Sequence, residues 1–197
     1  MNPKSPKVGL CLKIGMYLLS LWLLFVLIFV NKIKLDLCFG CSIATKKELL
    51  EIATVNYLPL ICVGLLLISL IFYFRFKFLI NGSKQGPKLI ESIENKGAEH
   101  LVFLATYIIP LVGFALENSR QVINLGITLI ILGTIYVKTN LFYANPTLSL
   151  LGFKIFGAKI DGKDVILIST SDIDAGDKIN FMPLDKKILF AKKAIQL

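Results

Sequence analysis

The chain has 197 residues, of which 55% are hydrophobic and only 18% are charged, and its formal net charge is +9 at pH 7. An ordinary soluble domain is nearer 25% charged, and the apolar residues of this chain are concentrated in blocks. These figures exclude a secreted enzyme, a disulfide-rich mini-protein and a disordered tail. They predict a membrane protein.

Four apolar blocks approach the length of about 20 residues that crosses a bilayer core. The predicted spans are residues 10–30, 55–74, 101–116 and 122–137. No small-residue cleavage site follows the first block, so we expect an uncleaved span there and not a signal peptide. The third and fourth blocks are separated by only a few residues, which predicts a tight helical hairpin. The predicted fold class is therefore an α-helical membrane protein with four transmembrane helices, followed by a small cytosolic all-β module.

The basic residues predict the orientation of these spans. In the four-span arrangement, 17 Lys and Arg residues lie on the side of the N-terminus and five lie on the opposite side. Because basic loops stay in the cytoplasm, we expect a multi-pass membrane protein with both termini in the cytoplasm. Residues 31–54 would then form an external loop, and residues 75–100 a cytosolic loop.

The predicted external loop carries Cys38 and Cys41 in the run DLCFGCS. A local disulfide and a pair of free thiols are both consistent with this spacing on the outer side of a membrane. Redox catalysis is disfavoured because no βαβ pattern surrounds the pair. Zinc binding is disfavoured because no second cysteine or histidine pair accompanies it. Further along the loop, the apolar residues of 46–53 have helical spacing and predict a short surface helix.

The two predicted cytosolic segments differ in their periodicity. Residues 88–99 place Leu89, Ile90 and Ile93 at roughly helical spacing, which predicts a short helix at the membrane surface. After Lys138, short runs rich in β-branched and aromatic residues alternate with turn sequences and predict about four strands. These runs are residues 153–158, 165–169, 178–182 and 188–192. The predicted domains are a transmembrane domain over residues 1–141 and a cytosolic β-rich tail over residues 142–197.

The sequence holds no recognisable chemical site. No predicted span has a charged residue or a histidine in its interior, which disfavours pumps and ion-coupled carriers. The chain has one histidine, no G-x-S-x-G motif and no phosphate-binding glycine loop, so we expect no enzyme, no cofactor and no metal. The basic residues of the tail alternate with acidic ones and lack a stacking pattern, so we expect lipid contact but no direct nucleic-acid binding.

Small residues in the fourth block predict contact between helices. Gly126 and Gly133 are seven residues apart, with Thr128 and Thr134 beside them. Such a stripe lets another helix approach closely. A homo-oligomer is therefore expected.

Several runs in the C-terminal half resemble the KwaA family, the membrane subunit of the Kiwa anti-phage defence system. They are HLVFLATYIIPLVGF from His100, IYVKTNLFYANPTLSLLGFKIF from Ile135, and VILIS from Val165. Within them, Tyr143, Asn145, Pro146, Thr147 and Gly152 belong to the most specific stretches. The resemblance implies a tetrameric, non-enzymatic sensor in the bacterial inner membrane that engages a cytosolic DNA-binding effector, KwaB.

The same stretch predicts a boundary between the membrane region and the tail. A residue before proline avoids the helical conformation, so we expect helix to stop at Asn145 and the chain to turn into the tail there. Motion in the membrane would then reach the cytosolic module through this junction. The alternative function is a small oligomeric channel or a pore-forming effector that damages the membrane.

Overall fold

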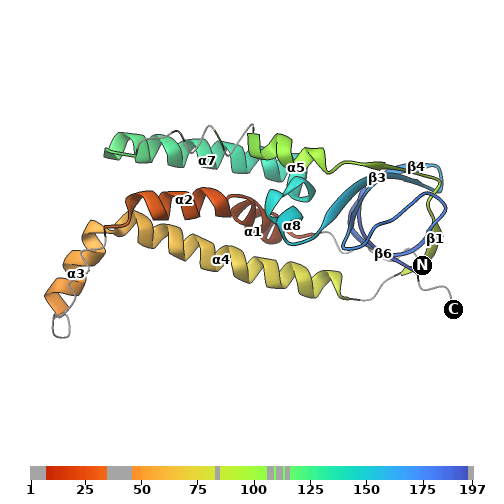
Figure 1. Ribbon diagram of the computed structural model, residues 1–197, viewed down its shortest axis with the longest axis horizontal. Coiled ribbons are helices and arrows are strands. Elements are labelled where there is room, and N and C mark those ends of the chain that lie inside the picture. The colour runs from red at the N-terminus through yellow and green to blue at the C-terminus, as the bar shows by residue number, and fades with distance from the viewer. Residues whose placement is uncertain are drawn as a thin grey trace.

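The computed structural model of the protein describes residues 8–34, 46–82, 85–105, 109, 113 and 116–194. Its helices form one end of an elongated molecule and its strands form the other (Figure 1). The helices are α1 (Leu10–Ser20), α2 (Trp22–Lys32), α3 (Lys46–Val55), α4 (Tyr57–Ile80), α5 (Ala98–Phe103), α7 (Ser119–Thr139) and α8 (Pro146–Leu150), with a 3₁₀ turn η2 (Leu141–Ala144). The strands are β1 (Gln85–Leu89), β2 (Ser92–Asn95), β3 (Lys154–Ile160), β4 (Lys163–Ser169), β5 (Lys178–Asp185) and β6 (Ile188–Lys193).

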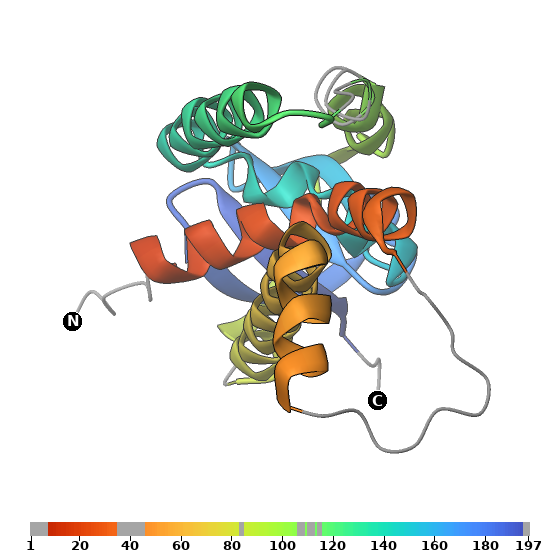
Figure 2. The same cartoon turned by 90° about the vertical axis from the view of Figure 1, so that its left-hand side faces the viewer.

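The long helices are arranged with α1 and α2 between α4 and α7, as Figure 2 shows from the end of the bundle. Helix α1 packs against both neighbours, and α2 continues the contact with α4. The α1–α2 pair bends by 48° at Leu21, which lies between the two helices. At the far end, the Asn56 amide bonds to the backbone of Lys34 and Ile52, which ties the end of α2 to the break between α3 and α4.

The prediction of an α-helical membrane protein with four spans is wrong. Among the described residues, α4 and α7 are long and apolar enough to cross a membrane, and the bent α1–α2 pair is a third candidate if it acts as one span. These three correspond to the predicted spans 10–30, 55–74 and 122–137. Together with the six-stranded sheet they give a mixed α/β protein.

The third predicted span, residues 101–116, is not found as a helix of spanning length in the described residues. Helix α5 is described for six residues, and most of the block beyond it lies outside the described part of the chain. The block is short, and its sequence contains Pro110 and Gly113, which disfavour a continuous helix. Hydropathy alone measures apolar length and not helical continuity.

The sheet has six strands in the order β1-β5-β6-β4-β3-β2, with β4 and β6 parallel and the other pairs antiparallel. The four predicted strand runs of the tail correspond to β3, β4, β5 and β6. The tail does not build the sheet alone, because both edge strands come from residues 85–95. Strands β1 and β2 are joined by Ile90 and Glu91 only, so the sheet curves strongly and this short connection links its two edges (Figure 1).

The predicted helix at residues 88–99 is therefore wrong. The Ile90 amide donates to the Asp177 carbonyl and the Glu91 amide donates to the Lys159 carbonyl, so this segment bridges the two sides of the sheet. Ile90 is buried and Ile93 packs beside it inside the sheet. Pairing with strands far along the chain has overridden the local helical spacing.

Successive apolar residues of the strands point alternately into two separate cores. The inner core includes Ile90, Phe156, Leu167, Ile179 and Phe181, which share the interior of the curved sheet. The outer face of the same strands contributes to the larger core that also holds the helices. The residues that contribute are Ile168, Met182, Leu184, Ile188 and Phe190 of the strands, together with Phe153 directly before β3. The helices and the sheet are therefore joined by continuous apolar packing.

Candidate functional site at the junction of helices and sheet

The residues between α7 and β3 form the place where the helices and the sheet meet. Helix α7 ends at Asn140, which adopts the left-handed conformation (φ 57°, ψ 32°) and whose amide donates to the carbonyls of Tyr136 and Val137. Asparagine tolerates this conformation better than most residues. The chain then runs through η2 and α8, which contact α1, α5 and α7 before the first strand of the tail begins.

Asn145 is the polar centre of this junction. Its side chain is fully buried, and its backbone is extended (φ −74°, ψ 115°), as expected for a residue before proline. The side-chain oxygen accepts from the Thr147 amide at 2.9 Å and caps α8. The side-chain nitrogen donates to the Met16 carbonyl of α1, also at 2.9 Å. One side chain thus fixes the start of α8 and binds it to α1.

The neighbours of Asn145 strengthen the same contact. Pro146 begins α8, where its missing amide costs nothing. The Thr147 hydroxyl donates to the Leu19 carbonyl of α1 at 2.6 Å. Gly152 ends α8 with φ 84°, and the Phe153 amide returns to the Leu148 carbonyl at 2.9 Å. Of the predicted junction residues, Asn145 and Thr147 bond to α1, and Gly152 supplies the turn into β3.

A second polar contact joins α1, α7 and the sheet. The Lys13 ammonium lies 2.9 Å from the Asp185 carboxylate at the end of β5, and it also donates to the Asn140 side-chain oxygen. The side chains of Lys13 and Asp185 are only 16% and 14% exposed. At such burial an ion pair is less screened than on a free surface. The sequence shows Lys13 as a charge near the start of the first apolar block, but nothing in it identifies Asp185 as the partner.

Helix α5, which carries His100 and Phe103, contacts η2 at the junction. The His100 ring is buried, and neither ring nitrogen makes a hydrogen bond of ordinary geometry. Burial lowers the pKa of His100, against smaller opposing contributions from the backbone of Ala144 and Asn145 and from the Glu99 carboxylate. Burial also raises the pKa of Tyr143, and Glu99 adds to this rise.

The lowered pKa of His100 predicts acid sensitivity. The folded protein favours the neutral ring, so its stability is complete above the ordinary histidine pKa of about 6.5 and falls as the pH drops below that value. We expect the thermal midpoint of the detergent-purified protein to fall between about pH 7.5 and about pH 5. His100 is the only histidine in the chain, so His100→Gln should flatten this dependence. An equally steep decline in the variant would contradict the assignment.

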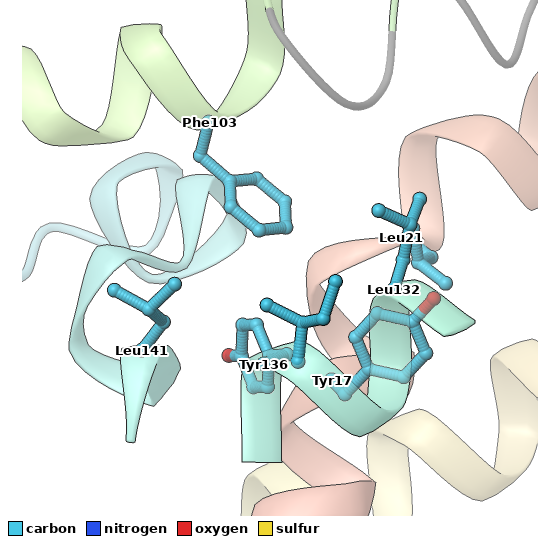
Figure 3. A pocket seen from close by; sticks show the side chains of 7 residues that line it. Tyr17, Leu21, Phe103, Leu132, Tyr136 and Leu141 are labelled. Atoms are coloured by element: carbon cyan, nitrogen blue, oxygen red, sulfur yellow. The ribbon is translucent and has the colours of Figure 1, made fainter. Parts of the chain in front are cut away.

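Aromatic side chains from three elements, α1, α5 and α7, converge beside the junction (Figure 3). The Tyr17 hydroxyl donates to the Leu129 carbonyl of α7 at 2.7 Å, and the Tyr136 hydroxyl reaches the Met16 carbonyl at 3.4 Å. The rings of Tyr17, Phe103 and Tyr136 surround a cavity of about 10 Å³, which is at the lower limit for one water molecule. This cluster is a packing core and is too small to be a ligand site.

The two predicted packing glycines have different surroundings. A Cβ atom on Gly133 would lie 2.7 Å from Cε1 of Tyr17, so this glycine admits the close approach of α1 and α7 within the chain. A Cβ atom on Gly126 would meet nothing within 4 Å. Gly15, which the sequence analysis did not single out, is tighter still, because its Cβ would lie 2.0 Å from Cγ of Phe72 on α4. Of these three glycines, Gly126 alone has open space for contact with a second copy.

These surroundings predict opposite results for one substitution at two glycines. Gly133→Ala should lower the free energy of unfolding by about 1–3 kcal/mol, the usual cost of overpacking, whereas Gly126→Ala should change it little. Thermal unfolding followed through the fluorescence of Trp22, the only tryptophan, measures both. Equal destabilisation by the two variants would be inconsistent with the described packing.

The cysteine pair and possible metal ligands are the remaining candidate chemical sites. Cys38 and Cys41 lie outside the described residues, so their disulfide stays a prediction. Within the described residues, no group of three or more metal-ligating side chains is found. The functional residues that sequence reasoning missed are Lys13, Asp185 and His100, whose roles depend on contacts across the fold.

Comparison with known proteins covers most of the chain. Residues 12–190 match the family described as "Anti-phage protein KwaA". The Kiwa protein KwaA of Escherichia coli O55:H7 (strain RM12579 / EPEC) is 35% identical over 191 residues, which cover 93% of this chain and 96% of that relative. No solved structure matches the chain significantly.

Proposed function

The chain belongs to the KwaA family and is an anti-phage defence protein of the Kiwa system, and from this premise we propose that it is a non-enzymatic sensor and scaffold in the bacterial inner membrane. Its apolar helices lie in the bilayer and its sheet lies in the cytosol. The protein forms a homo-oligomer, and its cytosolic side recruits or controls a soluble DNA-binding effector. The resemblance noted in the sequence implies a tetramer.

The ends of the helices that adjoin the sheet support this orientation. Residues 85–95 and the tail both enter the sheet, and the Val8 amide donates to the Leu184 carbonyl of the sheet at 3.0 Å. The start of α1, the end of α4 and the described part of the tail therefore lie at the same end of the molecule. In the sequence, the segments that adjoin these points carry the excess of Lys and Arg, as expected for a cytoplasmic side.

The observation that carries the proposal is the buried junction itself. Asn145 and Thr147 bond to the backbone of α1, and one apolar core continues from the helices into the sheet. A sheet attached by a loose linker would move independently of the membrane helices. Here α8, which is bonded to α1, leads directly into β3, and Lys13 of α1 pairs with Asp185 of β5, so the sheet must follow a displacement of α1. A sensor coupled to a cytosolic partner requires such a connection.

Oligomerisation has its own support in α7. Isoleucines on this helix remain exposed in the chain, among them Ile123, Ile127, Ile130 and Ile131. Gly126 lies on the same helix with open space at its Cβ position. Lipid or a second copy of the chain can cover this face, and small residues favour close contact between helices.

The function is tested by two measurements on the full chain expressed in bacteria. Affinity purification from detergent extract should retain the soluble Kiwa effector encoded with it, and overexpression without that effector should leave the membrane potential intact. Failure to retain the effector would contradict the scaffold function. Collapse of the membrane potential would favour the alternative, a channel or pore-forming effector.

A further inference from the structure

An open apolar groove lies between the beginning of α1 and the end of α4. Its volume is about 800 Å³, within the range of about 300–1,000 Å³ that is common for small-molecule sites. Apolar side chains supply most of its lining, among them Leu12, Phe72, Phe74 and Phe78. Phe74 and Phe78 are 58% and 85% exposed, so the groove presents aromatic surface that the chain itself does not cover.

One charged residue, Arg75, lines this groove. Arg75 directly follows the uncharged run 55–74, so it stands where the apolar part of α4 ends. Its side chain is exposed, and among the described residues no carboxylate lies within ion-pair distance of it. With α4 in the bilayer, the guanidinium would lie near the headgroups of the leaflet that faces the sheet.

The two halves of the groove match the two halves of a phospholipid. A planar guanidinium binds phosphate through paired, charge-assisted hydrogen bonds, and the aromatic walls suit an acyl chain. Basic pockets between helices on the cytoplasmic side are the usual form of anionic lipid sites. A neutral helix from a second copy would leave the Arg75 charge without a partner, so charge complementarity favours an anionic lipid.

We propose that the α1–α4 groove binds one anionic phospholipid, with its phosphate on Arg75 and an acyl chain against Phe72, Phe74 and Phe78. Lipid binding at this site would make the packing of α1 and α4, next to the junction, depend on the surrounding lipid. Lys13, whose ammonium bonds to the sheet, lies on α1 directly after the groove residue Leu12. The inference rests on the proposal that α4 lies in the membrane.

The experiment titrates the detergent-purified chain with phosphatidylglycerol and with phosphatidylcholine of the same acyl composition and counts bound lipids by native mass spectrometry. Wild type should bind phosphatidylglycerol at least about tenfold more tightly than phosphatidylcholine, and Arg75→Gln should remove that preference, as expected for losing one charge-assisted contact. Arg120→Gln is the matched control, because Arg120 is the only other arginine in the sequence, is exposed, and does not line the groove.

A second variant tests the apolar half of the site. Gly9 lines the groove, has φ −62°, and has open space at its Cβ position, so Gly9→Leu should fill the groove without strain and weaken binding of both lipids. Equal binding of the two lipids by wild type would overturn the proposal, as would an unchanged preference in Arg75→Gln or an equal loss in Arg120→Gln. Membrane fractionation of the same cells separates the two failures: a chain absent from the membrane contradicts the proposed function, whereas an inserted chain without lipid preference contradicts only the lipid site.

Discussion

Asn145→Ala is expected to lower the free energy of unfolding by about 2–4 kcal/mol. The substitution removes the cap of α8, worth about 1 kcal/mol, and removes the buried hydrogen bond to the Met16 carbonyl, where an unsatisfied group costs about 1–3 kcal/mol. Both bonds are made by the same fully buried side chain. Thermal or denaturant unfolding of the detergent-purified protein measures the change.

The matched control is Asn118→Ala at the start of α7. Asn118 is also an asparagine that caps a helix, and its side chain accepts from the Gln121 amide at 3.0 Å, but it is exposed and bonds to no other element in the described contacts. Its loss should cost only the capping contribution of about 1 kcal/mol. If the two substitutions had the same effect, the Asn145 bond to α1 would contribute nothing measurable.

Lys13→Met is expected to destabilise the protein by about 2 kcal/mol, between the values for exposed and fully buried ion pairs. The substitution keeps the apolar length of the side chain but removes the ammonium that joins Asp185 and Asn140. Unfolding is measured for Lys13→Met, Asp185→Asn and the double variant, and the double-mutant cycle gives the coupling between the two residues.

Lys154→Met supplies the control for this cycle. Lys154 pairs with Asp172 on the surface, where the two side chains are 48% and 79% exposed, so the loss should stay below about 1 kcal/mol. Additive effects of Lys13→Met and Asp185→Asn in the double variant would show that the pair does not hold α1 to the sheet.

The strands of the tail were predictable because their signal is local. Each of the runs at 153–158, 165–169, 178–182 and 188–192 is rich in β-branched or aromatic residues and is bounded by turn sequences. The hairpin between β3 and β4 shows why: Asp161 and Gly162 both have positive φ, as a two-residue turn of this kind requires. Composition and turn chemistry sufficed there without knowledge of the fold.

The edge strands could not be predicted in the same way. Leu89, Ile90 and Ile93 fit a helix about as well as a strand, and the decision is made by partners at residues 155–159 and 177–181. Only the pairing with these distant residues places Ile90 inside the sheet. The third apolar block, residues 101–116, lies partly outside the described residues; its hydropathy predicts a span, whereas Pro110 in the same stretch disfavours a continuous helix.

The junction was predictable in part. The Asn145-Pro146 pair predicts a break in the helix, because the ring of Pro146 restricts the backbone of Asn145 directly before it. Their partner on α1 is a main-chain carbonyl of Met16, and every residue has such a carbonyl, so no sequence pattern identifies it. The contact between Lys13 and Asp185 is hidden for a similar reason, since 172 positions separate the two residues.

The central claim is that the buried junction couples the membrane helices to the cytosolic sheet during phage defence. The most direct test is the efficiency of phage plating on cells that carry the complete Kiwa system with Asn145→Ala or Asn118→Ala in this chain, at equal amounts in the membrane fraction. Asn145→Ala should raise plating toward that of cells without the system, and Asn118→Ala should leave protection close to wild type. Full protection by Asn145→Ala at the same membrane level would contradict the coupling.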